Sequence, residues 1–216
     1  QRVALARTLT LKPDILLLDE PLSAIDVSLK GELRSLLRRL NQKGQTIVHV
    51  THDYEEAISL ASKVAIIQDG EIVQTGTPKE VFRNPKNRFV AHFGGIKNFY
   101  EAKLESDPNT ETTKACINEK ISFQILTKYE AKKGYVLIGQ KNILLSRVPQ
   151  HTSTINQFKG TIKELIPARM GFDVIVETGV DFYVSVTSES VKSFNYVEGQ
   201  EVWVAFNPSA VKFIPG

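Results

Sequence analysis

Two acidic residues directly follow an unbroken apolar run near the start of the chain. Residues 15–18 read Ile-Leu-Leu-Leu, and Asp19 and Glu20 come next. A run of this kind predicts a β-strand buried on both faces, as in a parallel sheet covered by helices. Carboxylates are tolerated at the end of such a strand, where they meet water or a cation, and in doubly wound sheets ligands bind at this end. The run alone also suits a strand that simply ends in surface acids.

A histidine follows a second predicted strand. Residues 46–50, Thr-Ile-Val-His-Val, are mostly β-branched and apolar. Asp53 and Glu56 have the spacing of a capping box that opens a helix ending at about residue 61. His52 therefore lies at a strand-to-helix junction, and we expect it to point at the site where the two acids converge. His49, in the strand itself, is expected to pack inside the sheet.

Further elements are expected around these two strands. They are helices over 1–11 and 27–40, a hairpin of strands 63–68 and 71–75, and a short helix that opens at Thr77. Asp69-Gly70 is a strong two-residue turn signal between the hairpin strands. Thr77 and Glu80 have the spacing of a second capping box.

Residues 15–26, ILLLDEPLSAID, resemble the Walker B segment and D-loop of ATP-binding-cassette (ABC) ATPases of the importer type. QRVALART at 1–8 resembles the helix that follows the LSGGQ signature of this family, and VTHD at 50–53 resembles its H-loop. The resemblance is continuous from residue 1 to residue 95, although Ile25 stands where many members have leucine. It implies an α/β fold, the C-terminal half of a P-loop ATPase domain.

The resemblance also implies roles for individual residues. Asp19 would hold Mg²⁺ through water, because Mg²⁺ keeps most of its hydration shell. Glu20 would be the general base that positions the attacking water against the γ-phosphate of ATP, and His52 would contact that phosphate. Asp26 would end the D-loop, which touches the partner subunit in a closed ATP-bound dimer.

One part of the ATPase pattern does not occur in these residues. The sequence contains no GxxxxGK[ST], the loop that cradles phosphates and supplies a lysine and a Mg²⁺-binding hydroxyl. Much of the stabilisation of the transferring phosphoryl group would come from that loop. The Q-loop glutamine and the LSGGQ signature would lie upstream of residue 1. We therefore expect the chain to be the C-terminal part of a longer ATPase and to hydrolyse no ATP by itself.

The pattern changes after residue 95, where short strands alternate with turns. Evenly spaced strands of this kind predict a small all-β barrel or sandwich. The predicted strands are 102–106, 114–117, 121–125, 135–138, 160–166, 172–178, 182–186, 201–206 and 211–214. The predicted domains are 1–97, the α/β ATPase part, and 98–216, an all-β OB-like barrel.

From about residue 153 the second region resembles the Mop-like, transport-associated OB module, which binds molybdate or tungstate in several proteins. Residues 153–160, STINQFKG, align with the SARNxLxG opening of that family. Backbone N–H groups and hydroxyls can ring a tetrahedral oxyanion without a formal positive charge. By position, the candidates for such a ring are Ser153, Asn156, Thr187 and Ser209.

The sequence departs from the Mop pattern at several of its polar positions. Ile155 replaces the usual arginine, Asn207 replaces a lysine near the last strand, and Ser188 and Glu189 replace a basic pair. Glu189 would repel an oxyanion if it pointed inward. Two interpretations therefore stay open: a regulatory oxyanion site, or an OB-like barrel kept for dimer contacts that binds nothing.

Composition and charge narrow the functional class. The apolar fraction of 42% and the charged fraction of 24% are ordinary for a globular protein. A net charge of +3 gives no argument for nucleic acid or an anionic membrane as a partner. Few Lys or Arg accompany the aromatic residues between 171 and 190, which disfavours an OB-fold that binds single-stranded nucleic acid. The single cysteine, Cys116, excludes an internal disulfide and fits a reducing cytosol.

The sequence therefore predicts an energy-coupling, ATP-hydrolysing subunit of an importer, with molybdate or tungstate as cargo and as a regulatory ligand of the β domain. The resemblance implies a homodimer of ATPase subunits at the cytoplasmic face of the membrane, docked on permease subunits and served by a substrate-binding protein. Two alternatives remain. One is the same ATPase serving sulfate, iron or polyamine. The other is a free-standing oxyanion-binding module.

Overall fold

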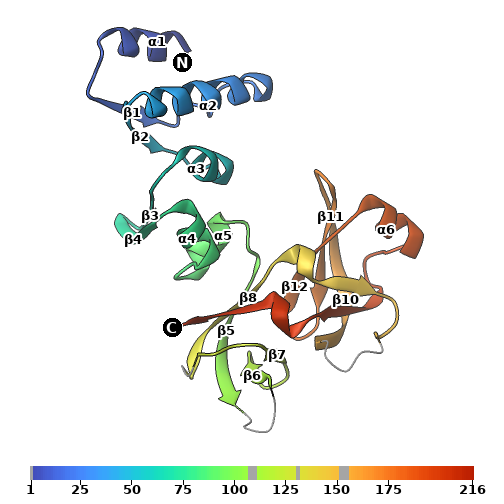
Figure 1. Cartoon of the computed structure of the whole chain (residues 1–216). Coiled ribbons are helices and arrows are strands. Elements are labelled where there is room, and N and C mark those ends of the chain that lie inside the picture. The colour runs from blue at the N-terminus through green and yellow to red at the C-terminus, as the bar shows by residue number, and fades with distance from the viewer. Residues whose placement is uncertain (1, 107–110, 130–131, 151–155) are drawn as a thin grey trace. The chain divides into compact units, whose positions relative to one another are not determined.

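The computed structural model describes residues 2–106, 111–129, 132–150 and 156–216 (Figure 1). The chain divides into two compact units, Gln1–Pro85 and Lys86–Gly216. The first mixes helices with parallel and antiparallel strands, and the second consists mainly of antiparallel strands. The expected order, an α/β part followed by an all-β part, is confirmed. Across the described residues, no helix is both long and apolar enough to cross a membrane.

The first unit is built on a pair of parallel strands, β1 (Ile15–Asp19) and β2 (Thr46–Val50). Its remaining elements are α1 (Arg2–Thr10), α2 (Val27–Gln42), α3 (Tyr54–Leu60), β3 (Val64–Gln68), β4 (Glu71–Gly76) and α4 (Pro78–Arg83). Leu16 is 1% exposed, whereas Leu17 is 74% exposed. The prediction that β1 is buried on both faces is therefore wrong for the described chain. Successive residues of a strand point to opposite faces, and only one face of β1 is covered here.

The hairpin and the helix after it form as the turn chemistry predicts. Asp69 and Gly70 have φ values of 52° and 80° between β3 and β4, as a two-residue hairpin turn of type I′ requires. The capping box of α4 is confirmed, because Glu80 N donates to Thr77 Oγ1 and Thr77 N donates to Glu80 Oε2. The hydrogen bond from the Thr77 backbone holds the pKa of Glu80 below its usual value.

The second unit contains two five-stranded sheets. Its elements are α5 (Arg88–Phe93), β5 (Asn98–Ser106), β6 (Thr113–Cys116), β7 (Ser122–Ile125), β8 (Lys133–Ile138), η1 (Gln140–Asn142), β9 (Leu144–Ser146), β10 (Asn156–Ala168), β11 (Gly171–Glu177), β12 (Asp181–Val186), α6 (Ser188–Phe194), β13 (Glu201–Phe206), η2 (Pro208–Ala210) and β14 (Val211–Pro215). The strand order is β14-β8-β5-β6-β7 in one sheet and β12-β11-β10-β13-β9 in the other. The sequence analysis found nine of these strands and missed β9, α5 and α6.

The strand order reveals an internal repeat that exchanges its last strand. Each half of the unit runs through four strands and a 3-10 turn to a fifth strand, β5 to β9 in the first half and β10 to β14 in the second. The fifth strand of each half joins the sheet of the other half: β14 pairs with β8, and β9 pairs with β13. In Figure 1 the red C-terminal strand lies alongside β8. Both sheets contribute to one hydrophobic core, which contains Phe123 and Phe182.

Two buried asparagines at equivalent points of the repeat join one sheet to the other. Asn98, at the start of β5, accepts a hydrogen bond from Tyr183 N at 2.8 Å and donates to Tyr183 O at 2.8 Å. Asn156, at the start of β10, accepts from Gln124 N at 2.6 Å and donates to Gln124 O at 2.9 Å. Each amide therefore pairs with the backbone of one residue on the opposite sheet. The exposed fractions are 0% for Asn98 and 6% for Asn156.

Replacing either asparagine with alanine should destabilise the second unit. The partner N–H and C=O lose their hydrogen bonds in a partly buried setting, which costs about 1–3 kcal/mol. Unfolding of the chain in urea can be followed by the fluorescence of Trp203, the single tryptophan, which lies in β13. The control is Asn142→Ala, an exposed position in η1, which should change the free energy of unfolding by less than about 0.5 kcal/mol. Equal stability of Asn98→Ala, Asn156→Ala and the control would contradict this role.

Candidate functional site

Glu20 occupies the first position after β1 and has an unusual backbone. Its φ of 46° lies in the left-handed region, which non-glycine residues adopt uncommonly and which often marks a functional site. Glu20 N donates to Val50 O at 3.0 Å, so the β1–β2 pairing continues one residue beyond the strand. Ser23 donates to Glu20 O through both its N–H, at 3.2 Å, and its Oγ, at 2.8 Å. These bonds fix the turn that carries the Glu20 side chain.

Glu20 and His52 meet, as the sequence predicts. Glu20 Oε1 accepts a hydrogen bond from His52 N at 3.0 Å and lies 2.6 Å from His52 Nδ1. An ionised carboxylate can only accept, so Nδ1 carries the hydrogen of this bond. Nε2 is the ring nitrogen left for another partner, and Glu20 Oε2 takes no part in either bond. The His52 side chain is 81% exposed and that of Glu20 is 33% exposed, so solvent reaches both side chains.

The other two predicted residues of this site lie nearby in sequence but make no contact with the Glu20–His52 pair among the described interactions. Asp19 is exposed at the end of β1, opposite Val50 in the strand register. Its carboxylate makes no hydrogen bond within the described residues, and carboxylate oxygens are suitable ligands for Mg²⁺ or its bound water. Asp26 is the N-cap residue of α2, but its side chain makes no capping hydrogen bond.

The sequence analysis missed a buried network behind His52. Glu56 in α3 is 2% exposed, and its Oε2 lies 2.8 Å from Thr51 Oγ1 and 3.0 Å from His49 Nε2. The predicted capping box is therefore wrong for one of its two hydrogen bonds, because Asp53 N donates to Thr51 Oγ1 and not to the Glu56 side chain. Asp53 does cap α3, because its Oδ1 accepts from the N–H groups of Glu55 and Glu56. The carboxylate of Glu56 instead binds backwards to β2. The apolar surroundings of His49 gave no sign of a buried acid.

Three of the four oxyanion candidates lie in the described structure, and each of the three makes hydrogen bonds within the chain. Ser153, like Ile155, lies outside the described residues. The side-chain amide of Asn156 is engaged with Gln124 through both its oxygen and its nitrogen. Thr187 caps α6 by accepting from Ser190 N at 3.1 Å. Ser209 Oγ donates to Asn207 Oδ1 at 2.8 Å in η2. Within the described residues, no hydrogen bond joins any two of Asn156, Thr187 and Ser209.

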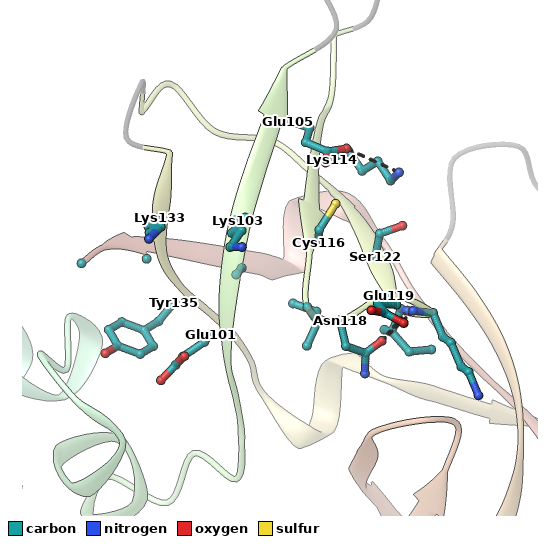
Figure 2. A pocket seen from close by; sticks show the side chains of 16 residues that line it. Glu101, Lys103, Glu105, Lys114, Cys116, Asn118, Glu119, Ser122, Lys133 and Tyr135 are labelled. Atoms are coloured by element: carbon teal, nitrogen blue, oxygen red, sulfur yellow. Dashed lines mark hydrogen bonds and ion pairs between the residues drawn. The ribbon is translucent and has the colours of Figure 1, made fainter.

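A shallow groove of about 940 Å³ lies on the outer face of the sheet that contains β5, β6 and β8 (Figure 2). Lys103 and Lys133 are opposite each other in the register of β5 and β8, and Glu105 forms an ion pair with Lys114 at 3.6 Å. Burial, followed by the nearby Glu105 carboxylate, raises the pKa of the Cys116 thiol. A raised pKa keeps the thiol protonated and makes it a poor nucleophile. The groove therefore carries side chains of both charges, and its described residues form no catalytic site.

The described residues contain no group of three or more His, Cys, Asp or Glu side chains placed to hold a metal ion. Asp19 alone cannot form a cage for a cation. It can supply one oxygen to a site completed by water and by a substrate phosphate, which is how Mg²⁺ is commonly held.

Known proteins similar to this chain include several import ATP-binding proteins, although no protein-family model matches it. The molybdate/tungstate import ATP-binding protein WtpC of Pyrococcus abyssi is 36% identical over 217 residues, which cover 98% of this chain and 60% of that protein. The spermidine/putrescine import ATP-binding protein PotA of Mycoplasmopsis synoviae is 35% identical over 198 residues, covering 90% of this chain and 41% of that protein. The chain thus spans less than two thirds of the length of either relative.

Two further similarities cover about half of the chain. The PotA protein of Pseudomonas fluorescens is 47% identical over 112 residues, 51% of this chain and 31% of that protein. A crystal structure of the cytoplasmic molybdate-binding protein ModG, with molybdate bound, is 12% identical and has a TM-score of 0.49 over 56% of this chain and 97% of that one.

Proposed function

We propose that this chain, which matches the C-terminal part of the ATP-binding subunits of ABC importers over 98% of its length, supplies the water-activating half of an ATPase site. The observation that carries the proposal is the 2.6 Å contact between Glu20 Oε1 and His52 Nδ1. It orients two side chains whose other polar atoms, Oε2 and Nε2, take no part in the contact. The parts of the chain that meet there are the ends of two adjacent parallel strands, where α/β sheets bind ligands.

Each atom of the pair has a separate task in the proposed mechanism. Glu20 Oε2 accepts the proton of the attacking water and aligns that water with the γ-phosphate. His52 donates Nδ1–H to Glu20, which holds the ring so that Nε2, when it also carries a hydrogen, donates to an oxygen of the γ-phosphate. Asp19 would hold Mg²⁺ through a bound water, and the chemistry that the ion would supply is neutralisation of charge on the phosphate oxygens. Asp26 ends the D-loop, the segment that would touch the second ATPase subunit of the dimer.

An ATPase site of this kind also needs a phosphate loop, which the 216 residues do not supply. No GxxxxGK[ST] occurs in the 216 residues, and the groups of that loop stabilise the transferred phosphoryl. We therefore propose that the chain hydrolyses no ATP when tested alone, and that the parent protein that contains the loop does. As an ATPase subunit it would work as a homodimer on permease subunits, at the cytoplasmic face of the membrane, with a substrate-binding protein delivering the cargo.

Molybdate or tungstate is our first candidate for the cargo. The relative named for these anions is 36% identical over nearly the whole chain, so its likeness extends through both compact units. Polyamine is the second candidate, because a relative named for spermidine and putrescine covers 90% of the chain at 35% identity. Since the two identities differ by so little, the cargo must be tested on the second unit, where Thr187 and Ser209 retain hydroxyls of the proposed oxyanion site.

Changing Glu20 to glutamine in the parent protein should preserve MgATP binding and abolish turnover. The amide keeps the hydrogen bond from His52 N but cannot accept a proton from water. We expect kcat to fall by about 100-fold or more, with nucleotide affinity changed by less than about threefold. Glu71→Gln, an exposed change in β4, is the matched control. Hydrolysis at the control rate would remove Glu20 from the mechanism.

Changing His52 to alanine should also slow hydrolysis severely while leaving the fold intact. The His52 side chain is 81% exposed, so its loss removes little buried surface, and we expect the midpoint of thermal unfolding to change by less than about 2 °C. The steady-state rate of phosphate release measures the effect on turnover. His92→Ala, an exposed histidine of α5, serves as the control. A large loss of stability with normal turnover would show that His52 is structural.

Isothermal titration of the 216-residue chain with molybdate, tungstate and sulfate tests the second unit. We expect saturable binding of molybdate or tungstate and rejection of sulfate, with weaker binding after Thr187→Ala or Ser209→Ala, since each change removes a hydroxyl donor. Absence of binding for all three anions would contradict the regulatory site. Polyamine would then become the leading candidate for the cargo.

A further inference from the structure

We infer that Glu56 is a positioning residue for His52, and that it acts through the hydroxyl of Thr51. The inference rests on the proposed function, because it concerns the same histidine. It concerns a buried side chain of α3 that lies outside the Glu20–His52 pair. Glu56 projects from α3 towards the end of β2, behind the segment that carries His52.

The hydrogen bonds of Thr51 have a definite direction. A hydroxyl has a single hydrogen to donate, and Thr51 Oγ1 donates it to Glu56 Oε2 at 2.8 Å. The lone pairs of Oγ1 are then available to the next donor, and Asp53 N donates to Oγ1 at 3.0 Å. Glu56 thus orients the Thr51 hydroxyl as an acceptor for the backbone two residues later. His52 is the residue enclosed by this bridge.

The bridge and the Glu20 bonds both restrain His52. The threonine hydroxyl joins residues 51 and 53 on either side of it in sequence, while His52 N and Nδ1 both donate to Glu20. Without the bridge, the peptide between residues 52 and 53 could rotate, and the ring would leave its alignment with Glu20. Misplacement of a reacting group by about 1 Å can cost about 100-fold in rate.

The helix cap does not account for the burial of Glu56. Asp53 already caps α3 by accepting from two backbone N–H groups, and Arg34 lies 3.7 Å from Asp53 and 3.4 Å from Glu55. Among the described ion pairs, none joins Arg34 to Glu56. Its carboxylate is 2% exposed and binds Thr51 and His49, so its desolvation is offset by two donors that both belong to the β2 end.

The test compares variants that keep or remove each link, in the parent ATPase. Thr51→Val removes the hydroxyl at nearly constant volume, and Thr51→Ser keeps it. Glu56→Met removes the acceptor at similar length, and Glu56→Gln keeps an oxygen that can accept from both donors. We expect kcat to fall by about 10-fold to 100-fold in the Val and Met variants, with KM for ATP unchanged. The Ser and Gln variants should retain at least about half of the wild-type kcat.

A second measurement reads the position of the His52 ring without catalysis. In the 216-residue chain labelled with ¹⁵N-histidine, the Nδ1 resonance of His52 is the one lost in His52→Ala. We expect Thr51→Val to shift that resonance away from its strongly hydrogen-bonded value, and Thr51→Ser to leave it in place. Because it requires no ATPase activity, this measurement tests the positioning of His52 separately from its proposed role in hydrolysis.

The outcomes separate the inference from the function on which it rests. If the parent protein or its His52→Ala variant shows that His52 has no part in hydrolysis, the proposed function fails, and the resonance still reports on the bridge. If His52→Ala abolishes turnover while Thr51→Val and Glu56→Met keep the wild-type kcat, the inference is overturned. The inference is also overturned if kcat in Thr51→Val and Glu56→Met falls only in proportion to their lost stability. In that case Thr51→Ser and Glu56→Gln would not retain the wild-type kcat either.

Discussion

The parallel register of β1 and β2 is the constraint on which the first unit depends. Asp19 is paired with Val50, and Glu20 N continues the pairing by donating to Val50 O. Both strands therefore end at the same level, and the residues that follow them, Glu20 and His52, come within 2.6 Å of each other. A shift of one residue in either strand would reverse the faces of all its side chains. Backbone pairing thus brings Glu20 and His52 to the same end of the sheet, where side-chain hydrogen bonds then orient them.

The second unit is held together by pairing between its two halves. Its two sheets exchange their last strands, so neither half of the repeat can complete its sheet alone. Asn98 and Asn156 then join the sheets at two equivalent points. This structural use of Asn156 bears directly on oxyanion binding. The Asn156 amide has one N–H left for an anion, and the Ser209 hydroxyl donates its hydrogen to Asn207, so anion binding would rely on rearranged hydroxyls of Thr187 and Ser209 and on backbone N–H groups.

Local patterns in the sequence were sufficient for most elements of the fold. The apolar runs predicted β1 and β2, Asp69-Gly70 predicted the hairpin, and Thr77 with Glu80 predicted the start of α4, because each of these signals acts within a few residues. The missed helices α5 and α6 begin at local caps, Asn87 and Thr187, that the sequence analysis did not use, whereas the missed strand depends on a distant partner. The three-residue strand β9 exists because it pairs with β13. The repeated pattern of asparagine, any residue, aromatic, any residue, small residue at 98–102 and 156–160 was a visible signal of the repeat.

At Glu56, spacing alone led the sequence analysis to an error. Spacing alone made it the reciprocal partner of Asp53, and for Thr77 and Glu80 the same spacing gave the correct answer. The difference lies in what stands behind the helix. α4 opens with its Glu80 carboxylate free to return to its own cap, whereas α3 follows a strand end whose Thr51 hydroxyl and His49 ring both need an acceptor. A buried donor left without a partner costs more than a cap gains, so the carboxylate turns towards β2. The demand that draws Glu56 inwards is thus the one that orders the residues on either side of His52.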